Sequence, residues 1–159
     1  MEMVISYFGE HALKAAQIQW IEETVQPDIY AVCTLKQSFG IMGDKGPVFT
    51  KGDRYRYEML CEQFHKRLSK EIVGAKRWRK SKTRIPLAAT LENKGASGEF
   101  HLNFYARRPH WMSFEEFRDA FLGVWFDIEW SRPNTYFKKR TGKCVIYGHK
   151  EGSATLLVF

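Results

Sequence analysis

The sequence predicts an α+β fold in which helices pack against a five-stranded, mostly antiparallel sheet. Five short segments are rich in β-branched or aromatic residues or alternate apolar with polar positions, and the stretches between them repeat apolar residues at helical spacing. Two of the five strands are separated only by a short Gly-containing connection, as in a β-hairpin. Because the chain has 159 residues, we expect one domain over 1–159.

The N-terminal part of the chain predicts a helix followed by a strand. Residues 8–26 carry apolar positions at a loose helical spacing, and Pro27 should end the helix. We therefore expect residues 1–28 to form an N-terminal helical extension. The β-rich segment 29–35 predicts the first strand.

The middle of the chain predicts a loop, a helix and two paired strands. The Gly-containing segment 38–52 is interpreted as a loop. Asp53 is a favourable N-cap, and the apolar pattern after it predicts a helix that Gly74 ends. Segments 85–91 and 99–107 predict two antiparallel strands.

The C-terminal part predicts two helices and two further strands. Ser113 and Glu116 have the spacing of a capping box, so a helix should begin there. Segment 126–130 alternates and suggests a strand, 143–151 suggests a short helix, and 154–159 suggests a last strand.

The composition predicts a soluble, cytoplasmic protein with reduced thiols. No apolar run is long enough to span a membrane, and the N-terminus lacks the pattern of a signal peptide. Cys33, Cys61 and Cys144 are an odd number of cysteines at wide spacings, which argues against a disulfide framework and against a CxxC site.

Two basic runs make a polyanion a candidate partner. The chain has 25 Lys and Arg against 18 Asp and Glu, a net charge of +7. An ordinary solvated surface explains such a charge equally well, but aromatic residues in or beside the runs favour nucleic acid, because bases stack on rings while cations hold phosphates. The candidate DNA-binding residues in these runs are Lys76, Arg77, Trp78, Arg79, Lys80, Lys82, Arg84, Lys138, Lys139 and Arg140.

Alternation in segment 99–106 places polar side chains on one face of a strand. His101 and Asn103 lie two residues apart on that face, roughly 6 to 7 Å along the strand, and both can reach one ion. Glu92, at the end of the preceding strand, lies across the hairpin from His101. These nitrogen and oxygen donors suit Mg²⁺ or Mn²⁺. The alternative is a polar strand face that meets water and a structural glutamate at a strand end.

Tyr147 is a candidate nucleophile. Lys150 follows it at a spacing that shares one face of a helix, where a cation favours a phenolate or the charge that develops at phosphorus. The segment Tyr136-Phe-Lys-Lys139 repeats this spacing, so Tyr136 is an alternative nucleophile, and most such pairs are structural.

Three segments in this order resemble the motifs of the HUH endonuclease superfamily, in particular the nuclease domains of rolling-circle replication initiators from circular single-stranded DNA viruses and plasmids. Cys33-Thr-Leu-Lys-Gln37 resembles the first motif, Phe-Thr-Leu-Asn-Asn. Glu92-Asn-Lys-Gly-Ala-Ser-Gly-Glu-Phe-His-Leu-Asn103 resembles the second, a liganding Glu and a Gly-rich hairpin before His-hydrophobic-His or His-Leu-Gln. Tyr147-Gly-His-Lys-Glu-Gly152 resembles the third, Tyr-x-x-Lys.

The resemblance implies a fold, a site and a reaction. The fold is a five-stranded antiparallel sheet flanked by helices, of the ferredoxin or RRM-like type. Glu92, His101 and Asn103 would bind a divalent metal, Mn²⁺ or Mg²⁺, and Tyr147 would attack DNA with the help of Lys150. Thr34 and Lys36 of the first motif join the candidate DNA-binding residues. Asn103 stands where the family more commonly has His or Gln.

The reaction implied is nicking and joining of single-stranded DNA through a 5′-phosphotyrosine intermediate, in rolling-circle replication or DNA mobilisation. Single-stranded DNA is the expected partner, with an origin hairpin and a separate helicase as further candidates. Two alternatives remain open: a non-catalytic nucleic-acid-binding protein of the same fold, and a protein-interaction or inhibitor protein.

Overall fold

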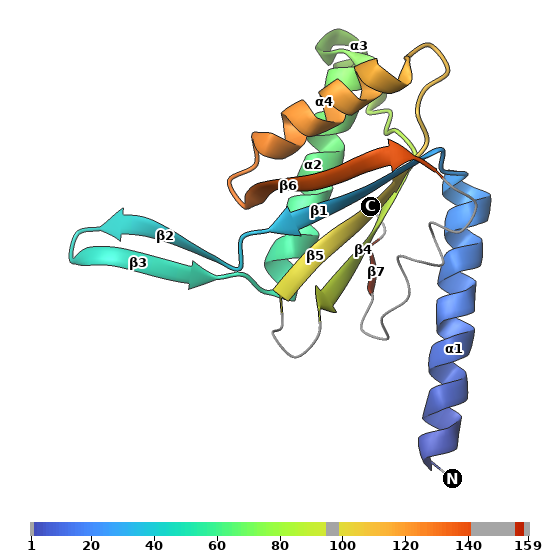
Figure 1. Cartoon of the computed structure of the whole chain (residues 1–159). Helices are drawn as coiled ribbons and strands as arrows, with labels where there is room; N and C mark the ends of the chain where they lie inside the picture. The colour runs from blue at the N-terminus through green and yellow to red at the C-terminus, as the bar shows by residue number, and fades with distance from the viewer. Residues whose placement is uncertain (1, 95–98, 141–154, 158–159) are drawn as a thin grey trace.

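The computed structural model describes residues 2–94, 99–140 and 155–157 and confirms the α+β class (Figure 1). The elements, in chain order, are α1 (Glu2–Trp20), the π-helix η1 (Ile21–Val25), β1 (Ile29–Leu35), β2 (Ser38–Gly43), β3 (Gly46–Lys51), α2 (Arg54–Val73), α3 (Ala75–Ser81), β4 (Leu87–Lys94), β5 (Glu99–Ala106), α4 (Phe114–Phe126), β6 (Ser131–Lys139) and β7 (Thr155–Leu157).

The main sheet has the strand order β6-β1-β5-β4-β7, and all neighbouring strands are antiparallel. Four longer strands form its body, and the three described residues of β7 pair with β4 at one edge. The order β1, α2, β4, β5, α4, β6 is the β-α-β-β-α-β arrangement of ferredoxin-like folds. Figure 1 shows α2 and α4 together on one side of this sheet, while α1 is drawn to the right, past β4 and β7.

The face of the sheet that meets α2 and α4 carries the main hydrophobic core. Alternate residues of the strands point to this face, including Ala31 and Cys33 of β1 and Leu102 and Phe104 of β5. Phe104 packs between rings from both helices, which are Phe64 of α2 and Phe121 and Trp125 of α4. The intervening side chains of each strand therefore point to the opposite face, and they include Glu92, His101 and Asn103.

One end of that opposite face is covered by the helical N-terminal segment. Ile21 and Val25 of the π-helix are buried with Tyr30, Ala88 and Tyr105 in a second, smaller cluster. Helical structure over 2–25 agrees with the predicted N-terminal extension, and the buried Pro27 follows the helix end. The extension thus packs against the sheet at the beginning of β1.

The predicted loop 38–52 is wrong, because this segment forms a separate two-stranded sheet, β2 and β3. Its glycines suggested a loop, but Phe49 covers Gly40, where an added Cβ would lie 2.8 Å from the ring. The hairpin projects from the body (Figure 1). It exposes Met42 by 81% and Phe49 by 71%.

The helix caps agree with the sequence. Asp53 accepts a hydrogen bond from the backbone N–H of Arg56 at 2.8 Å and begins α2, and Gly74 ends it. Ser113 and Glu116 form the predicted capping box of α4. The predicted strand 126–130 is wrong: backbone hydrogen bonds from Ile128 to Trp125 and from Ser131 to Ile128 form turns there, and the strand begins at Ser131.

Several other predictions fall on the ends of the chain or on the cysteines. The predicted last strand is present over the described residues 155–157. The predicted helix 143–151 lies outside the described residues. Cys33 and Cys61 are free and buried, and burial raises the pKa of both thiols. Within the described part of the chain, no helix has the length and apolar character needed to cross a membrane.

His65 makes the stability of the fold depend on pH. The ring is buried between α2 and the segment before β4, and Nε2 donates to the carbonyl of Ile85 at 2.6 Å. Burial lowers the pKa of His65, and nearby Arg84 acts in the same direction, while the Ile85 hydrogen bond opposes them. The unfolded chain therefore binds a proton at a higher pH than the folded chain, so His65 favours folding fully above about pH 6.5 and less as the pH falls.

We predict that acidification from pH 7.5 to 5 lowers the melting temperature of the wild type more than that of His65→Gln. Glutamine can donate a hydrogen bond to the Ile85 carbonyl but takes up no proton. Melting curves of both proteins across this range measure the difference. Parallel loss of stability in the two proteins would show that His65 does not carry this pH dependence.

Candidate functional site

The candidate site lies on the face of the main sheet opposite α2 and α4, which we call the polar face. Side chains of register-paired residues point to the same side of a sheet, so the strand register shows which residues of each strand lie on this face. The polar face is made by Tyr30, Val32 and Thr34 of β1, Ala88, Thr90 and Glu92 of β4, His101, Asn103 and Tyr105 of β5, and Tyr136 and Lys138 of β6.

Glu92 and His101 are brought together as the sequence predicts. They are register partners on β4 and β5, and His101 Nε2 lies 2.8 Å from Glu92 Oε2. Glu92 is only 4% exposed. A buried carboxylate is costly unless it is paired or hydrogen-bonded, so these contacts offset its loss of water. The contact has the character of an ion pair when His101 is protonated.

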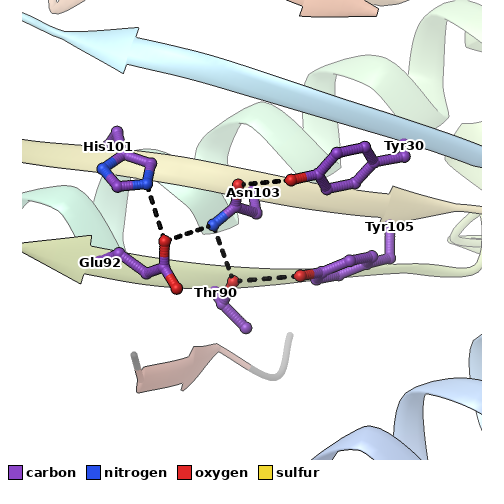
Figure 2. Close-up of polar contacts among 6 residues, drawn as sticks. All are labelled: Tyr30, Thr90, Glu92, His101, Asn103 and Tyr105. Carbon is purple, nitrogen blue, oxygen red and sulfur yellow. Dashed lines mark hydrogen bonds and ion pairs between the residues drawn. The ribbon is translucent and has the colours of Figure 1, made fainter. Parts of the chain in front are cut away.

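Asn103 joins the same carboxylate from the next position on the polar face (Figure 2). Its Nδ2 donates to Glu92 Oε2 at 3.0 Å and lies 3.3 Å from the Thr90 hydroxyl. Its Oδ1 accepts a hydrogen bond from the Tyr30 hydroxyl at 3.0 Å. Tyr105 extends the network, with its hydroxyl 3.4 Å from that of Thr90. Asn103 thus presents its nitrogen to Glu92 and its oxygen to Tyr30.

Two atoms of this cluster have no hydrogen-bond partner among the described residues. They are Glu92 Oε1 and His101 Nδ1, and both are buried. Buried polar atoms are usually paired, so Glu92 Oε1 is an acceptor of the buried carboxylate that no described residue uses.

The donor set of Glu92 and His101 suits a divalent cation. Carboxylate oxygen and imidazole nitrogen bind Mn²⁺ or Mg²⁺, and neighbouring ligand atoms on such an ion lie about 3 Å apart, close to the observed separation. Across the described ranges, no group of three or more His, Cys, Asp and Glu side chains is placed to hold a metal. The candidate set therefore has one carboxylate, one imidazole and an amide.

The end of β1 is fixed to β5 by Gln37, a residue of the first motif. Its Nε2 donates to the carbonyls of Leu35 and Phe100, and its Oε1 accepts from the Phe100 N–H at 2.8 Å. Phe100 precedes His101, so this clamp holds the backbone next to the imidazole. Thr34 is the register partner of His101, and its hydroxyl donates to the Asn134 carbonyl at 2.6 Å.

The first basic run lies away from the polar face. Residues 75–81 form α3, which follows α2 at the end of the molecule remote from the C-terminal end of β4 (Figure 1). Trp78 is half-buried, with Lys82 Nζ and Arg84 Cζ at 5.5 and 5.8 Å from its ring centre. The structure therefore does not bring the first basic run together with Glu92. The residues of this run are Lys76, Arg77, Trp78, Arg79, Lys80, Lys82 and Arg84.

The second basic run is divided between different surfaces. Lys138 lies on the polar face, with its ammonium 5.7 Å from the Tyr30 ring and 5.3 Å from the Tyr136 ring. Lys139 lies over Phe114 on the helical side. Arg140 bonds to Glu22 at 2.6 Å and to the Pro27 carbonyl, so it ties the end of β6 to the N-terminal segment. Lys36 lies at the base of the β2–β3 hairpin, with its ammonium over the Phe39 ring.

Tyr147 and Lys150 lie outside the described residues, so their candidate roles rest on the motif alone. Tyr136, the alternative nucleophile, lies on the polar face and is 57% exposed. Tyr30 and Thr90 are members of the cluster that local sequence patterns do not reveal. Their positions in strands with period-two alternation place them on the polar face, but only the strand order β1-β5-β4 shows that both reach Asn103.

Comparison with protein-family models, with curated proteins and with solved structures gave no significant match.

We predict that Gln37→Met lowers the free energy of unfolding by about 1–3 kcal/mol, because the Phe100 backbone loses both hydrogen bonds to the side chain. Chemical denaturation measures the change. Lys36→Met is the matched control: the Lys36 ammonium lies over the Phe39 ring, and its loss should change stability by less than about 0.5 kcal/mol. Equal losses in the two variants would show that Gln37 does not act as a clamp.

Proposed function

We propose that this protein is a metal-dependent endonuclease that nicks and rejoins single-stranded DNA through a tyrosine, as HUH replication initiators do. The observation that carries the proposal is the buried pair of Glu92 and His101, 2.8 Å apart on neighbouring strands of the polar face. Glu92 Oε1 has no partner within the described residues. A buried carboxylate beside an imidazole, with one carboxylate oxygen left unpaired, supplies donor atoms that suit a divalent cation.

The topology supports the same proposal. The second motif spans β4 and β5, and its Glu and His meet across that hairpin as a shared metal site requires. The first motif lies on β1, directly beside β5. Two of the three sequence motifs thus converge on one face of the sheet, and the third lies outside the described residues.

The proposed chemistry assigns a separate task to each group. Glu92 and His101 would hold Mn²⁺ or Mg²⁺, which when bound withdraws charge from a non-bridging phosphate oxygen. The Tyr147 oxygen loses its proton and forms a bond to phosphorus, while the bond from phosphorus to the 3′ oxygen breaks and that oxygen takes up a proton. The 5′ phosphate stays on tyrosine, and the free 3′ hydroxyl can reverse the step. Lys150 would stabilise the charge at the phenol or at phosphorus.

Lys138 and Tyr136 are the residues of the basic runs best placed to hold the strand near this site. Both lie on the polar face, and Tyr136 offers an exposed ring for base stacking beside a cation for phosphate. This pair also favours a second function, a non-catalytic nucleic-acid-binding protein of the same fold. In that case, DNA binding depends on salt but needs no divalent metal.

We predict a covalent protein-DNA product when the protein is incubated with mixed-sequence single-stranded oligonucleotides and Mn²⁺. A denaturing gel measures the product. Chelation of the metal and the variants Tyr147→Phe and Glu92→Gln should each abolish it, because they remove the cation, the nucleophile and a cation ligand respectively. Tyr136→Phe is the matched control and should retain the product.

Loss of the product in Tyr136→Phe with retention in Tyr147→Phe would make Tyr136 the nucleophile. DNA binding without any product, on a broad set of oligonucleotides with or without metal, would support the binding protein. Failure to bind single-stranded DNA at low salt would contradict both and favour a protein-interaction function, for which the exposed apolar side chains of the β2–β3 hairpin provide a surface.

A further inference from the structure

We propose that Asn103 is a positioning residue that orients Glu92, instead of a metal ligand, and that Tyr30 fixes the orientation of its amide. The inference rests on the proposed metal site and gives a different role to one of its three expected ligands. It follows from the direction of each hydrogen bond around the Asn103 side chain (Figure 2).

With Glu92 ionised, the hydrogen-bond network admits one orientation of the amide. Nδ2 lies 3.0 Å from Glu92 Oε2, an atom that only accepts when the carboxylate is ionised. The reversed amide would place two oxygens against each other at that distance. In the observed orientation, Nδ2 also donates to the Thr90 hydroxyl oxygen, and Oδ1 accepts a hydrogen bond from the Tyr30 hydroxyl. Both ends of the amide are therefore matched to their neighbours.

Tyr30 is held in place by a stacked ring, a lysine and the buried cluster of the π-helix. Its ring stacks on Tyr105 at 5.6 Å between centroids, with the planes 26° apart. The Lys138 ammonium lies 5.7 Å from the ring centre, and Ile21 and Val25 bury the same cluster. Tyr30 is only 3% exposed. The hydroxyl is thus a fixed donor, and the Asn103 oxygen remains turned toward β1.

This arrangement separates two accounts of Asn103. If Asn103 binds the metal through Oδ1, the amide must first turn its oxygen away from Tyr30, so loss of the Tyr30 hydroxyl removes a competing hydrogen bond. If Asn103 positions Glu92 through Nδ2, the Tyr30 hydroxyl holds the amide in its working orientation. The same substitution, Tyr30→Phe, therefore has opposite effects on metal affinity in the two accounts.

The test is Mn²⁺ binding by calorimetry to the full chain, without DNA. The positioning account expects Tyr30→Phe to weaken binding by about tenfold or more, as substitutions of groups that orient metal ligands commonly do. Tyr105→Phe is the matched control. It also removes one hydroxyl from a ring of the stacked pair, but this hydroxyl contacts Thr90 and not the Asn103 amide. It should bind Mn²⁺ within about twofold of wild type. Unchanged or tighter binding in Tyr30→Phe would overturn the proposal.

A second measurement uses the side-chain NH₂ signals of Asn103 in the nitrogen-15 NMR spectrum, identified by their absence in Asn103→Leu. The positioning account expects slow proton exchange in the wild type, with and without Mg²⁺, because Nδ2 stays bonded to Glu92. A shift to fast exchange when Mg²⁺ binds would show that the amide turns to become a ligand, which overturns the proposal even if Tyr30→Phe does not fold.

Failure of the metal site and failure of this inference give different results. If the wild type binds no Mn²⁺, the proposed function loses its cation. The orientation of Asn103 is then judged by exchange alone: faster exchange of the Asn103 NH₂ protons in Tyr30→Phe than in Tyr105→Phe supports the role of Tyr30, and equal exchange in the two variants overturns it.

Discussion

The buried carboxylate of Glu92 is the constraint on which the polar face depends. Its Oε2 accepts from two side chains of β5, His101 and Asn103, which lie two residues apart on the same face. A slip of one residue between β4 and β5 would move these donors to the hydrophobic side of the sheet and leave the carboxylate buried without partners. The geometry of the site therefore requires the observed register of β4 and β5. The same register places Leu91, Leu102 and Phe104 in the hydrophobic core on the other face.

The two faces of the main sheet carry different kinds of side chain. The helical side is filled by aromatic and aliphatic residues of α2 and α4, whose burial stabilises the domain. The polar face carries the titratable cluster, and the π-helix covers one end of it through Ile21 and Val25. Because these residues pack against Tyr30, the N-terminal segment is connected to Asn103 and then to Glu92. The extension whose role the sequence leaves unexplained thus supports the candidate site.

The sequence predicted the elements whose boundaries depend on short-range interactions, such as helix caps and β-rich runs. β1 is a β-rich run, α2 has an N-cap and a glycine stop, and α4 has a capping box, so their boundaries follow from short-range interactions. The hairpin β2–β3 was missed because its glycines resemble those of a loop, although Phe49 folds over Gly40. Segment 126–130 alternates like a strand but forms turns that connect α4 to β6.

The sequence predicted only the part of the site that lies on the β4–β5 hairpin. Alternation and hairpin pairing placed Glu92 opposite His101 and put Asn103 on the same face. Tyr30 is 73 residues from Asn103 in the sequence, and its contact depends on the pairing of β1 with β5, which no local pattern specifies. For the same reason, the sequence did not show that α3 carries its basic residues away from the polar face.

The most direct test of the central claim is a crystal structure of the protein soaked in Mn²⁺, with the metal located by its anomalous scattering. The account predicts a peak bonded to the Glu92 carboxylate and the His101 imidazole, with the Asn103 oxygen still bonded to Tyr30. A polar face without a peak at saturating Mn²⁺, or a peak that is held by other residues, would contradict the assignment of this face as a cation site.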